Sequence, residues 1–470
     1  MGSDAARNPA GGALSNAGSM NATSPSSQIT AAGAVAGDTA GLSRRRFLRN
    51  AGAAAIAAAA FPTLIPARAL GRDAGVAAPS NRTALGVIGM QQGWDGFWKC
   101  VDRRKEVVEA VALCDVDAQK LNGRLNETRK RPNGKSAKGW RDFREMFEKA
   151  GLDAVVLGAP DHWHGIMGVA AARKGIHIYG EKPLAHTLKE GRAIVDAVAQ
   201  HGVTWQTGSW QRSVPNFRRA VELVRNGRIG KLVRMEVGTL GDFGTPKRGV
   251  PADYGKPPAH LDYDMWVGPA QFTPYDSRRL HWNWRWVLNT GGGNLMDWVG
   301  HHVDIAQWGA NKDHTGPVKI RPIKAQFGET IYDAERTYEY ECVYADGLVM
   351  RVNSGNGTKF IGDTGKWIFV TRGKLSASDP AILNEVIGAE EFHLPPFSNH
   401  WTAFIDCLRT GGKTIAPAAT AHRSASVGHL GHIALTRNKT IEWDPEKEVI
   451  TNDEQGNAML YPSFRAPWTL

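Results

Sequence analysis

Beyond residue 82, short runs of apolar residues alternate with amphipathic segments over the first half of the chain. Continuous apolar runs are typical of strands buried on both faces, and the segments between them have the period of helices. We expect strands at Thr83–Met90, Val107–Cys114, Ala154–Ala159, Ile176–Gly180 and Val203–Thr207. We expect helices after the first strand up to about Arg103, and at Ala118–Lys130, Trp140–Ala150, His164–Lys174 and Leu188–His201. This alternation predicts βαβ units and a parallel sheet over residues 83–208.

The pattern changes after about residue 208. Longer strand-like runs occur at Lys231–Leu240, Arg321–Phe327, Thr337–Tyr344, Val349–Ser354 and Trp367–Thr371, and helical patterns at Asn399–Thr410 and Ala418–Arg437. We expect residues 209–470 to form an α+β domain with a large, open, mostly antiparallel sheet and C-terminal helices. The predicted fold class is therefore α/β, with a parallel sheet followed by this second domain.

The N-terminal segment has the composition of an export signal. Residues 1–42 are rich in Ala, Gly, Ser and Asn and bury too little surface to fold. The basic run Ser43–Arg49, SRRRFLR, precedes a modest apolar stretch and the sequence ARA at residues 67–69, which fits an A-x-A cleavage site. We interpret residues 1–69 as a twin-arginine signal with its leader, and residues 70–82 as a linker. This predicts a periplasmic or otherwise extracytoplasmic protein that uses the twin-arginine export machinery.

The same segment argues against a stable membrane anchor and changes the charge balance. Its apolar run is shorter than the roughly 20 residues that span a bilayer, and it contains Pro62 and Pro66. The whole chain has a formal charge of +11, and cleavage after Ala69 leaves 51 basic and 44 acidic residues, a charge of +7. Since these basic residues are scattered, we expect no nucleic-acid partner. The four cysteines do not have metal-ligand spacing, so no metal site is expected.

A glycine-containing turn follows the first predicted strand. Gly86, Gly89 and Gly93 surround it, but Gln91 stands where the second glycine of a G-x-G-x-x-G dinucleotide-binding motif belongs. That glycine lets the backbone approach a pyrophosphate. Taken alone, the turn therefore leaves dinucleotide binding open.

Asp115 strengthens the dinucleotide interpretation. An acidic residue at the end of the second strand accepts hydrogen bonds from the adenosine ribose hydroxyls and repels a 2′-phosphate. The expected cofactor is therefore NAD, with NADP as the alternative. Asp115 also stands where it can cap the helix that begins at Ala118, and the two roles are compatible.

Three further motifs point to a known family. They are PDHWH at residues 160–164 after a strand, EKP at residues 181–183 after the next strand, and GGGNLMDWVGHHVD at residues 291–304. With these motifs in this order, the chain resembles the glucose–fructose oxidoreductase / inositol dehydrogenase / rhizopine-catabolism (Gfo/Idh/MocA) family, and most closely its exported twin-arginine branch. The resemblance extends from about Ala84 to the sequence RAPW at residues 465–468.

The resemblance implies a Rossmann domain followed by an α/β domain with a large open sheet, with the nicotinamide end of the cofactor between them. Lys182 matches the family lysine that hydrogen-bonds the reacting hydroxyl, and Asp297 and His301 match the substrate-binding and proton-transfer pair. The resemblance also implies a homo-oligomer, a dimer or tetramer, that uses the open sheet as its interface. The glycine turn departs from the family pattern at Gln91, so the resemblance leaves the position of the bound cofactor open but not the fold.

The chemistry of these residues fits the removal of hydride from a secondary alcohol. A cation such as Lys182 stabilises the developing alkoxide, and a histidine such as His301 takes the hydroxyl proton. Asp297 and His301 are four residues apart and share a face on a helix, while Asp304 follows one turn later where it can fix the tautomer of His301. The expected catalytic residues are Lys182, His301 and Asp297. The expected cofactor-binding residues are Gly89, Met90, Gln91, Gly93, Asp115, Pro160, His162, His164, Glu181 and Lys182.

Tryptophan is unusually frequent, at 16 of 470 residues. The run Trp282–Trp286 would place three indoles on one side if it were extended, and indole faces stack on sugar rings. A carbohydrate substrate is therefore expected. Core or interface packing is the alternative for these tryptophans, and we favour the core for Trp298 and Trp308. The expected substrate-binding residues are Trp163, Trp210, Arg212, Trp286, Asp297 and His301.

Several polar residues near the motifs are open to a structural interpretation. Asp161 is expected to cap a helix rather than to bind a ligand, and His302 is expected to be structural. His162 and His164 are both candidates for the nicotinamide pocket, and the alternative for His164 is a place inside its helix.

An enzyme outside the cytoplasm has no supply of NADH, so its cofactor must stay bound and be restored in each turnover. We therefore expect an NAD(P)-dependent oxidoreductase with a tightly bound cofactor that acts on a CH–OH group of a sugar, polyol or glycoside. Redox-neutral hydrolysis or elimination of a glycoside meets the same requirement. A dehydrogenase with a diffusible electron acceptor and a non-catalytic sugar-binding protein of the same fold stay open as well.

Overall fold

The computed structural model describes residues 81–246, 254–396 and 399–470. The predicted export signal, residues 1–69, and all but the last two residues of the predicted linker lie outside these ranges. The described residues belong to one unit that contains two β-sheets. No helix in these ranges has the length and the apolar character needed to cross a membrane.

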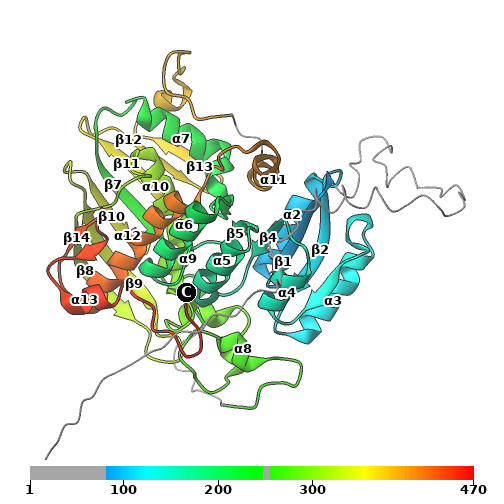
Figure 1. Cartoon of the computed structure of the whole chain (residues 1–470). Helices are drawn as coiled ribbons and strands as arrows, with labels where there is room; N and C mark the ends of the chain where they lie inside the picture. Colours follow the sequence, from blue (N-terminus) through cyan, green and yellow to red (C-terminus); the bar gives the residue numbers. More distant parts are fainter. Residues whose placement is uncertain (1–80, 247–253, 397–398) are drawn as a thin grey trace, which may run out of the picture. The chain divides into compact units, whose positions relative to one another are not determined.

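The first sheet has six strands in the order β3-β2-β1-β4-β5-β6, and all of them run parallel (Figure 1). Its strands are β1 Thr83–Ile88, β2 Val108–Cys114, β3 Lys138–Trp140, β4 Ala154–Leu157, β5 His177–Gly180 and β6 Trp205–Thr207. The helices that connect them are α2 Gln92–Arg103, α3 Ala118–Arg129, α4 Phe143–Lys149, α5 His164–Arg173 and α6 Leu188–His201. The strand order reverses between β1 and β4, where ligands of such sheets bind at the carboxyl ends of the strands. The predicted parallel sheet is confirmed.

One predicted helix is wrong at its start. The helix expected at Trp140–Ala150 begins at Phe143, because Asp142 caps it and accepts a hydrogen bond from the backbone N–H of Arg144. Trp140 instead ends the edge strand β3, which pairs with β2. This strand has only three residues, too few for a periodic pattern to indicate it.

The second sheet has nine strands in the order β13-β12-β11-β7-β10-β9-β8-β14-β15. Its strands are β7 Leu232–Thr239, β8 Lys319–Phe327, β9 Glu335–Val343, β10 Val349–Asn353, β11 Asn356–Gly362, β12 Trp367–Thr371, β13 Lys374–Ala377, β14 Ile441–Asp444 and β15 Val449–Ile450. The helices of this half are α7 Pro215–Arg225, α8 Tyr263–Val267, α9 Gly293–Trp298, α10 Asp304–Gly309, α11 His400–Thr410, α12 Ala418–Arg437 and α13 Glu454–Ala458. Among the described strands of this sheet only the β7–β10 pair is parallel, so the predicted mostly antiparallel sheet is confirmed.

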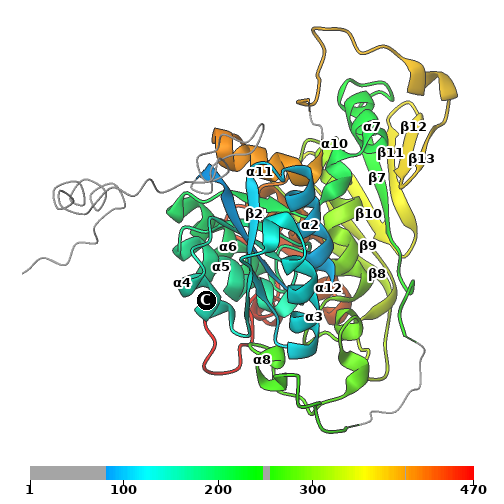
Figure 2. The same cartoon turned by 90° about the vertical axis from the view of Figure 1, so that its right-hand side faces the viewer.

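The two faces of the second sheet differ in chemistry. Helices α7, α10 and α12 cover one face (Figure 2), and alternate strand residues such as Met350 and Val352 are buried under them. The residue between these two, Arg351, lies on the other face and pairs with Glu339 of β9, which also pairs with Lys324. Within the described ranges this outer face carries ion pairs and no covering helix.

The motif at residues 291–304 does not form one continuous α-helix. Helix α9 ends at Trp298, residues Val299–Val303 form a π-helical turn, and α10 begins at Asp304. A π-turn inserts one residue into the helical repeat and often occurs at functional sites. The α-helical spacing that relates residues 297, 301 and 304 in the sequence therefore does not hold here.

An irregular segment, residues 254–290, crosses the carboxyl end of the first sheet; we call it the strap. Two backbone hydrogen bonds fasten it to the loop after β2, from Ala118 N to His260 O at 2.9 Å and from Asp262 N to Val116 O at 3.1 Å. The Arg141 guanidinium adds a third bond to this junction by donating to Val116 O at 2.8 Å. The strap thus connects the second half of the chain to the first sheet.

The C-terminal tail, residues 461–470, also packs on the first half of the chain. The Trp468 ring contacts the Trp163 ring edge-on with centroids 4.8 Å apart. Arg465 donates to the Gly268 carbonyl oxygen at 2.9 Å and pairs with Asp264 of the strap. The tail therefore supports both Trp163 and the strap from behind.

Candidate active site

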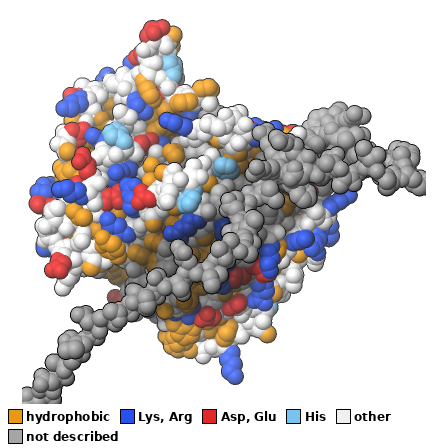
Figure 3. All heavy atoms as spheres, in the orientation of Figure 1, with side chains coloured by type: hydrophobic (Ala, Val, Ile, Leu, Met, Phe, Trp, Pro, Cys, Tyr) orange, Lys and Arg blue, Asp and Glu red, His pale blue; other side chains and the backbone are white. Residues whose placement is uncertain are grey.

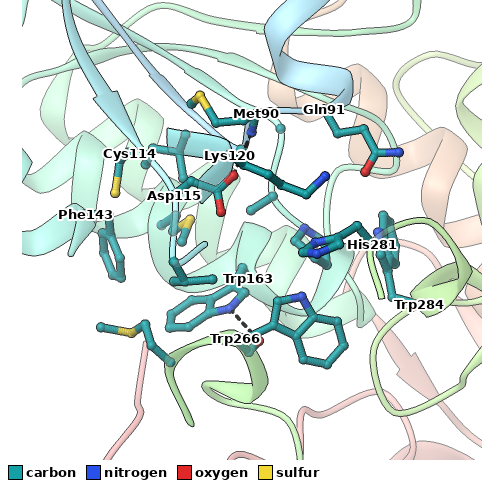
Figure 4. A pocket seen from close by; sticks show the side chains of 18 of the residues that line it. Met90, Gln91, Cys114, Asp115, Lys120, Phe143, Trp163, Trp266, His281 and Trp284 are labelled. Carbon is teal, nitrogen blue, oxygen red and sulfur yellow. Dashed lines mark hydrogen bonds between the residues drawn. The ribbon is translucent and has the colours of Figure 1, made fainter. Parts of the chain in front are cut away.

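A pocket of about 790 Å³ opens where the strand order of the first sheet reverses (Figure 4). It lies at the ends of β1, β2 and β4, and the strap covers it from the opposite side. The residues that line it include Ile88, Gly89, Met90, Gln91, Asp115, Lys120, Arg141, Pro160, Trp163, Trp266, His281, Trp284 and Arg285.

The glycine turn after β1 is shaped by close backbone packing. Gly89 has φ +87°, and a Cβ there would lie 2.5 Å from the Gly158 carbonyl oxygen. A Cβ at Gly93 would lie 2.8 Å from Gly158 Cα. Gly93 therefore serves helix–strand packing and does not line the pocket, whereas Gln91 lines it in place of the usual second glycine.

Asp115 lies in the pocket with both carboxylate oxygens held by the backbone. The N–H groups of Met90 and Asp117 each donate to it at 2.9 Å. Burial raises the pKa of Asp115, and these two hydrogen bonds oppose that effect. The predicted capping role is wrong, because Asp117 caps α3 and accepts from Gln119 N at 2.9 Å. Asp115 thus joins the glycine turn to the end of β2.

The other walls of the pocket combine indoles with positive charge. Trp266 and Trp284 come from the strap, and Trp163 donates to the Trp266 carbonyl oxygen at 3.2 Å (Figure 4). Lys120 lies beside Asp115, and His281 enters from the strap (Figure 4). Flat apolar walls, a carboxylate and nearby cations match a dinucleotide with aromatic rings, ribose hydroxyls and phosphates. The residues present therefore fit NAD.

A second cluster of charged groups adjoins this pocket. Lys182 Nζ donates to Asp297 Oδ1 at 2.6 Å, and Arg285 Nε donates to the same oxygen at 3.4 Å. Burial opposes ionisation of Asp297, but the charges of Lys182 and Arg285 outweigh it and lower its pKa. Because Arg285 also lines the pocket, it lies between the cofactor-sized space and the Lys182–Asp297 pair.

His301 belongs to the same cluster. It is buried, and its Nδ1 has no hydrogen-bond partner among the described residues. Burial and the positive charges of Lys182 and Arg372 lower the pKa of His301 well below its usual value, so the ring is neutral. Gly300 lets Lys182 pass beside it, because a Cβ there would lie 2.8 Å from Lys182 Cβ. A neutral imidazole with an open nitrogen is a proton acceptor.

Asp161 does not cap a helix, contrary to expectation. No side-chain cap bond is present at the 3₁₀ turn Asp161–Trp163 or at α5. Burial raises the pKa of the Asp161 carboxyl well above its usual range, against the charge of nearby Lys182, and Asp297 raises it further. Asp161 is therefore a buried carboxyl beside the Lys182–Asp297 pair whose proton is held more strongly than usual.

The expected roles of Asp304 and Arg212 are wrong. Asp304 does not orient His301, because the π-turn directs it to Arg212, whose Nε donates to Asp304 Oδ2 at 2.6 Å. The other end of the Arg212 guanidinium donates to both oxygens of Asp313 at 2.8 Å. Ser424 also donates to Asp304, at 2.9 Å. Arg212 is 2% exposed and fully engaged, so it holds the fold together and does not face substrate.

Four further residues expected at the cofactor, His162, His164, Glu181 and Lys182, do not line the pocket. The ring nitrogens of His164 lie 2.8 Å from Pro183 O and 2.9 Å from Ala159 O, and those of His162 also face backbone carbonyls. Such partners make both histidines structural, and His164 ties the residue after Lys182 to the end of β4. Glu181 is also outside the pocket, and burial raises its pKa to about 7.

The tryptophans divide between the two sites and the core. Residues Asn283–Trp286 form a 3₁₀ turn, so the three indoles of this run do not share one face of a strand as expected. Trp286 packs in a small apolar cluster with Val287 and Tyr332. Trp210 and Trp298 instead flank His301, with centroids 6.1 Å and 5.3 Å from its ring. Trp298 is half-buried in this cluster and is not a core residue as expected.

Two arginines at the site were missed in the sequence. Arg285 lies inside the tryptophan run at residues 282–286, where the aromatic pattern drew attention away from it. Arg372 lies in the turn between β12 and β13, and no motif marks it. Both gain their position from contacts between segments far apart in the chain, which a local pattern does not show.

His302 lies next to this cluster and has a structural role, as expected. Its Nδ1 donates to the Gly238 carbonyl oxygen at 2.6 Å, and the Thr358 hydroxyl donates to its carbonyl oxygen at 2.9 Å. These partners lie on β7 and β11. His302 therefore anchors the π-turn to the second sheet.

Glu190 lies in a neighbouring cavity that His162 and His186 also line. We expect it to make the free energy of unfolding depend on pH. Burial raises its pKa from 4.5 to about 8. The folded protein then keeps a proton that the unfolded chain releases, so the free energy of unfolding falls as pH rises from about 4.5 to about 8. We expect Glu190→Gln, which still offers an oxygen to the Thr187 hydroxyl, to remove this fall, on the order of 4 kcal/mol.

Urea unfolding at pH 5, 7 and 9 checks this expectation. The exposed Glu145 on α4 provides the matched control, and Glu145→Gln should leave the slope of stability against pH unchanged. An equal slope in the Glu190→Gln variant and the unchanged protein would contradict the assignment.

Comparison with known proteins agrees with this architecture. Residues 84–209 match the profile described as "Oxidoreductase family, NAD-binding Rossmann fold". Residues 219–470 match the profile "Oxidoreductase family, C-terminal alpha/beta domain". The predicted NAD-binding domain is confirmed.

Individual relatives are distant. The chain is 26% identical over 321 residues to scyllo-inositol 2-dehydrogenase (NAD(+)) of Bacillus subtilis, covering 64% of this chain and 81% of the relative. It is 28% identical over 248 residues to a "Glycosyl hydrolase family 109 protein" of Stenotrophomonas maltophilia, covering 51% of this chain and 50% of that relative.

A solved structure shows the same fold. The WlbA dehydrogenase of Bordetella pertussis, in complex with NADH and UDP-GlcNAcA, superposes with a TM-score of 0.58 at 16% identity. The match covers 77% of this chain and 99% of that chain. Together, the two matched profiles and the observed fold show that the chain belongs to the Gfo/Idh/MocA oxidoreductase family.

Proposed function

We propose that the protein is an exported oxidoreductase that keeps its NAD bound and removes hydride from a CH–OH group of a sugar, polyol or glycoside. The observation that carries the proposal is the cluster of Lys182, Asp297 and His301 beside a pocket that fits NAD. A lysine, a carboxylate and a neutral imidazole are the groups that alcohol oxidation needs.

A nicotinamide bound in the pocket supplies the hydride acceptor. The Lys182 ammonium, held by Asp297 at 2.6 Å, is placed to stabilise the alkoxide that forms on the substrate. His301 is the general base, because its neutral ring has an open Nδ1 that accepts the hydroxyl proton. Asp297 holds the Lys182 ammonium in the position where the alkoxide forms.

The strap supports retention of the cofactor. Trp266 and Trp284 form part of the pocket wall, and backbone hydrogen bonds join the strap to the loop after β2. Dissociation of a dinucleotide would require these contacts to open. A cofactor retained in this way must be restored within the site, either by a second carbonyl substrate or by a redox-neutral reaction.

Glycoside cleavage without net oxidation is the second candidate. It is supported by the relative named glycosyl hydrolase family 109 protein and by the same need to restore a retained cofactor. The inositol dehydrogenase relative supports oxidation of a ring alcohol. Both candidates use the same cluster and differ only in the fate of the oxidised intermediate.

Export and assembly complete the proposal. The run SRRRFLR at residues 43–49 supports twin-arginine export to the periplasm or another extracytoplasmic space. The uncovered outer face of the second sheet supports a homo-oligomer, a dimer or tetramer. Charged side chains of both signs are interspersed on the face in Figure 3, a pattern that favours no nucleic-acid partner.

Release of the bound nucleotide tests the proposal. We expect the exported protein, purified without added nucleotide and then denatured, to release one NAD or NADH per chain, identified by absorbance and mass spectrometry. NADP(H) would keep the enzyme class but contradict the role of Asp115. A preparation that releases no nucleotide would contradict retention and favour a sugar-binding protein of the same fold.

A further inference from the structure

Arg372 occupies a distinctive position beside the proposed catalytic histidine. Its guanidinium carbon lies 4.7 Å from the centroid of Trp210 and 4.3 Å from that of Trp298. The same two indoles flank His301. The turn between β12 and β13 thus carries a cation, held by two aromatic rings, to the side of the base.

The guanidinium is anchored at one nitrogen. The Gln211 amide lies between His301 O and Arg372 Nε, and we assign its orientation from these two neighbours: its nitrogen donates to His301 O at 3.1 Å, and its oxygen accepts from Arg372 Nε at 3.1 Å. Among the described residues, the terminal nitrogens of Arg372 have no hydrogen-bond or ion-pair partner, and the residue is exposed. The Nε and the faces of the Arg372 guanidinium are engaged, so its two terminal nitrogens are left to donate to a ligand.

Other arginines on the same sheet, unlike Arg372, lie close to a carboxylate. Arg351 pairs with Glu339, and Arg234 lies 3.5 Å from Glu236. Arg372, by contrast, has no carboxylate within ion-pair distance in the described ranges. Its indole contacts hold it beside the site without an ion pair in the described ranges.

The charge around His301 reinforces this difference. Lys182 and Arg285 both donate to Asp297 Oδ1, at 2.6 Å and 3.4 Å. Arg372 adds a positive charge that forms no ion pair with Asp297 in the described ranges. A guanidinium in this position attracts an anion.

We propose that Arg372 binds an anionic substituent of the substrate, a carboxylate or a phosphate on the sugar, while the reacting hydroxyl lies at Lys182 and His301. This inference rests on the proposed function and narrows its substrate class to acidic sugars. A guanidinium with two open terminal nitrogens binds either anion in a bidentate manner. Its place beside the base, across the same two indoles, would let it hold a substituent on a different carbon from the reacting one.

Matched sugars test the inference in the intact protein with its retained nucleotide. Glucose, glucuronate and glucose 6-phosphate, with the corresponding galactose set, are compared by reduction of the bound nicotinamide. We expect one acidic form to react with a kcat/KM at least about 10-fold above its neutral parent, and which acid does so identifies the anion. Arg372→Gln should raise KM for that acid by about 10-fold to 100-fold and bring its kcat/KM close to that of the neutral parent.

Lys374 provides the control, because it is exposed on the same hairpin and Lys374→Gln should change neither substrate. Equal rates for acids and neutral parents, or an equal loss for both in Arg372→Gln, would overturn the inference while leaving the proposed function intact. If no sugar reduces the nucleotide, quenching of tryptophan fluorescence by glucuronate and glucose 6-phosphate decides the matter. Saturable quenching that Arg372→Gln abolishes upholds the anion site, and its absence overturns it.

Discussion

Replacing Lys182 with methionine should lower the rate of hydride transfer by about 100-fold to 1,000-fold while the nucleotide stays bound. Methionine fills much of the same space but offers no positive charge to the developing alkoxide. The nucleotide stays bound because Lys182 does not line the cofactor pocket. Single-turnover reduction of the bound nicotinamide measures the rate, and nucleotide released on denaturation measures occupancy.

Lys174 provides the matched control for this substitution. It is an exposed lysine at the end of α5 that pairs with Glu148, so Lys174→Met should leave the rate within about twofold of the unchanged protein. A Lys182→Met protein that keeps its nucleotide and turns over at the unchanged rate would remove Lys182 from the mechanism. Loss of nucleotide in this variant would instead show that Lys182 contributes to cofactor binding.

Replacing Asp304 with alanine should destabilise the protein by about 3–5 kcal/mol, because it leaves the buried Arg212 charge with only part of its compensation. Asp304 accepts hydrogen bonds from Arg212 and Ser424 in a buried environment, and Asp313 alone would remain to pair with the guanidinium. The free energy of unfolding, measured by urea denaturation followed by circular dichroism, checks the prediction.

Two further variants separate this structural role from substrate binding. Arg212→Met combined with Asp304→Leu removes both charges and should recover much of the lost stability. Arg173→Gln, at an exposed arginine on α5, should leave stability within about 0.5 kcal/mol. A large rise in KM without loss of stability in Arg212→Met would contradict the structural role and restore Arg212 to the substrate site.

Sequence reasoning succeeded where local pattern and structure coincide. The apolar runs that end at Cys114 and Leu157 are buried on both faces, so hydrophobicity alone indicated the parallel strands. Lys182 follows one such strand, and its short motif is therefore placed at the edge of the sheet where ligands bind. The pairing of Lys182 with Asp297 also agrees with the resemblance, which related two motifs that lie far apart in the chain.

The failures have physical causes that a local pattern does not contain. Asp304 was assigned to His301 by α-helical spacing, and the π-turn at Val299–Val303 changes that spacing. Strand β11 was missed because Gly357 and Gly362 interrupt its apolar alternation. The strap has little regular structure, so its place over the pocket depends on backbone hydrogen bonds to a loop far away in the sequence.

The C-terminal tail sets an order of events during synthesis. Trp468 packs on Trp163, which lines the cofactor pocket, and Arg465 holds the strap that covers it. Trp468 and Arg465 are synthesised long after the last strand of the first sheet, β6, which ends at Thr207. The pocket therefore acquires this wall only after the first sheet has been synthesised, and a dinucleotide that binds the first sheet alone meets neither the strap nor the tail. The proposed export of a folded and loaded protein places loading after this step and before transport.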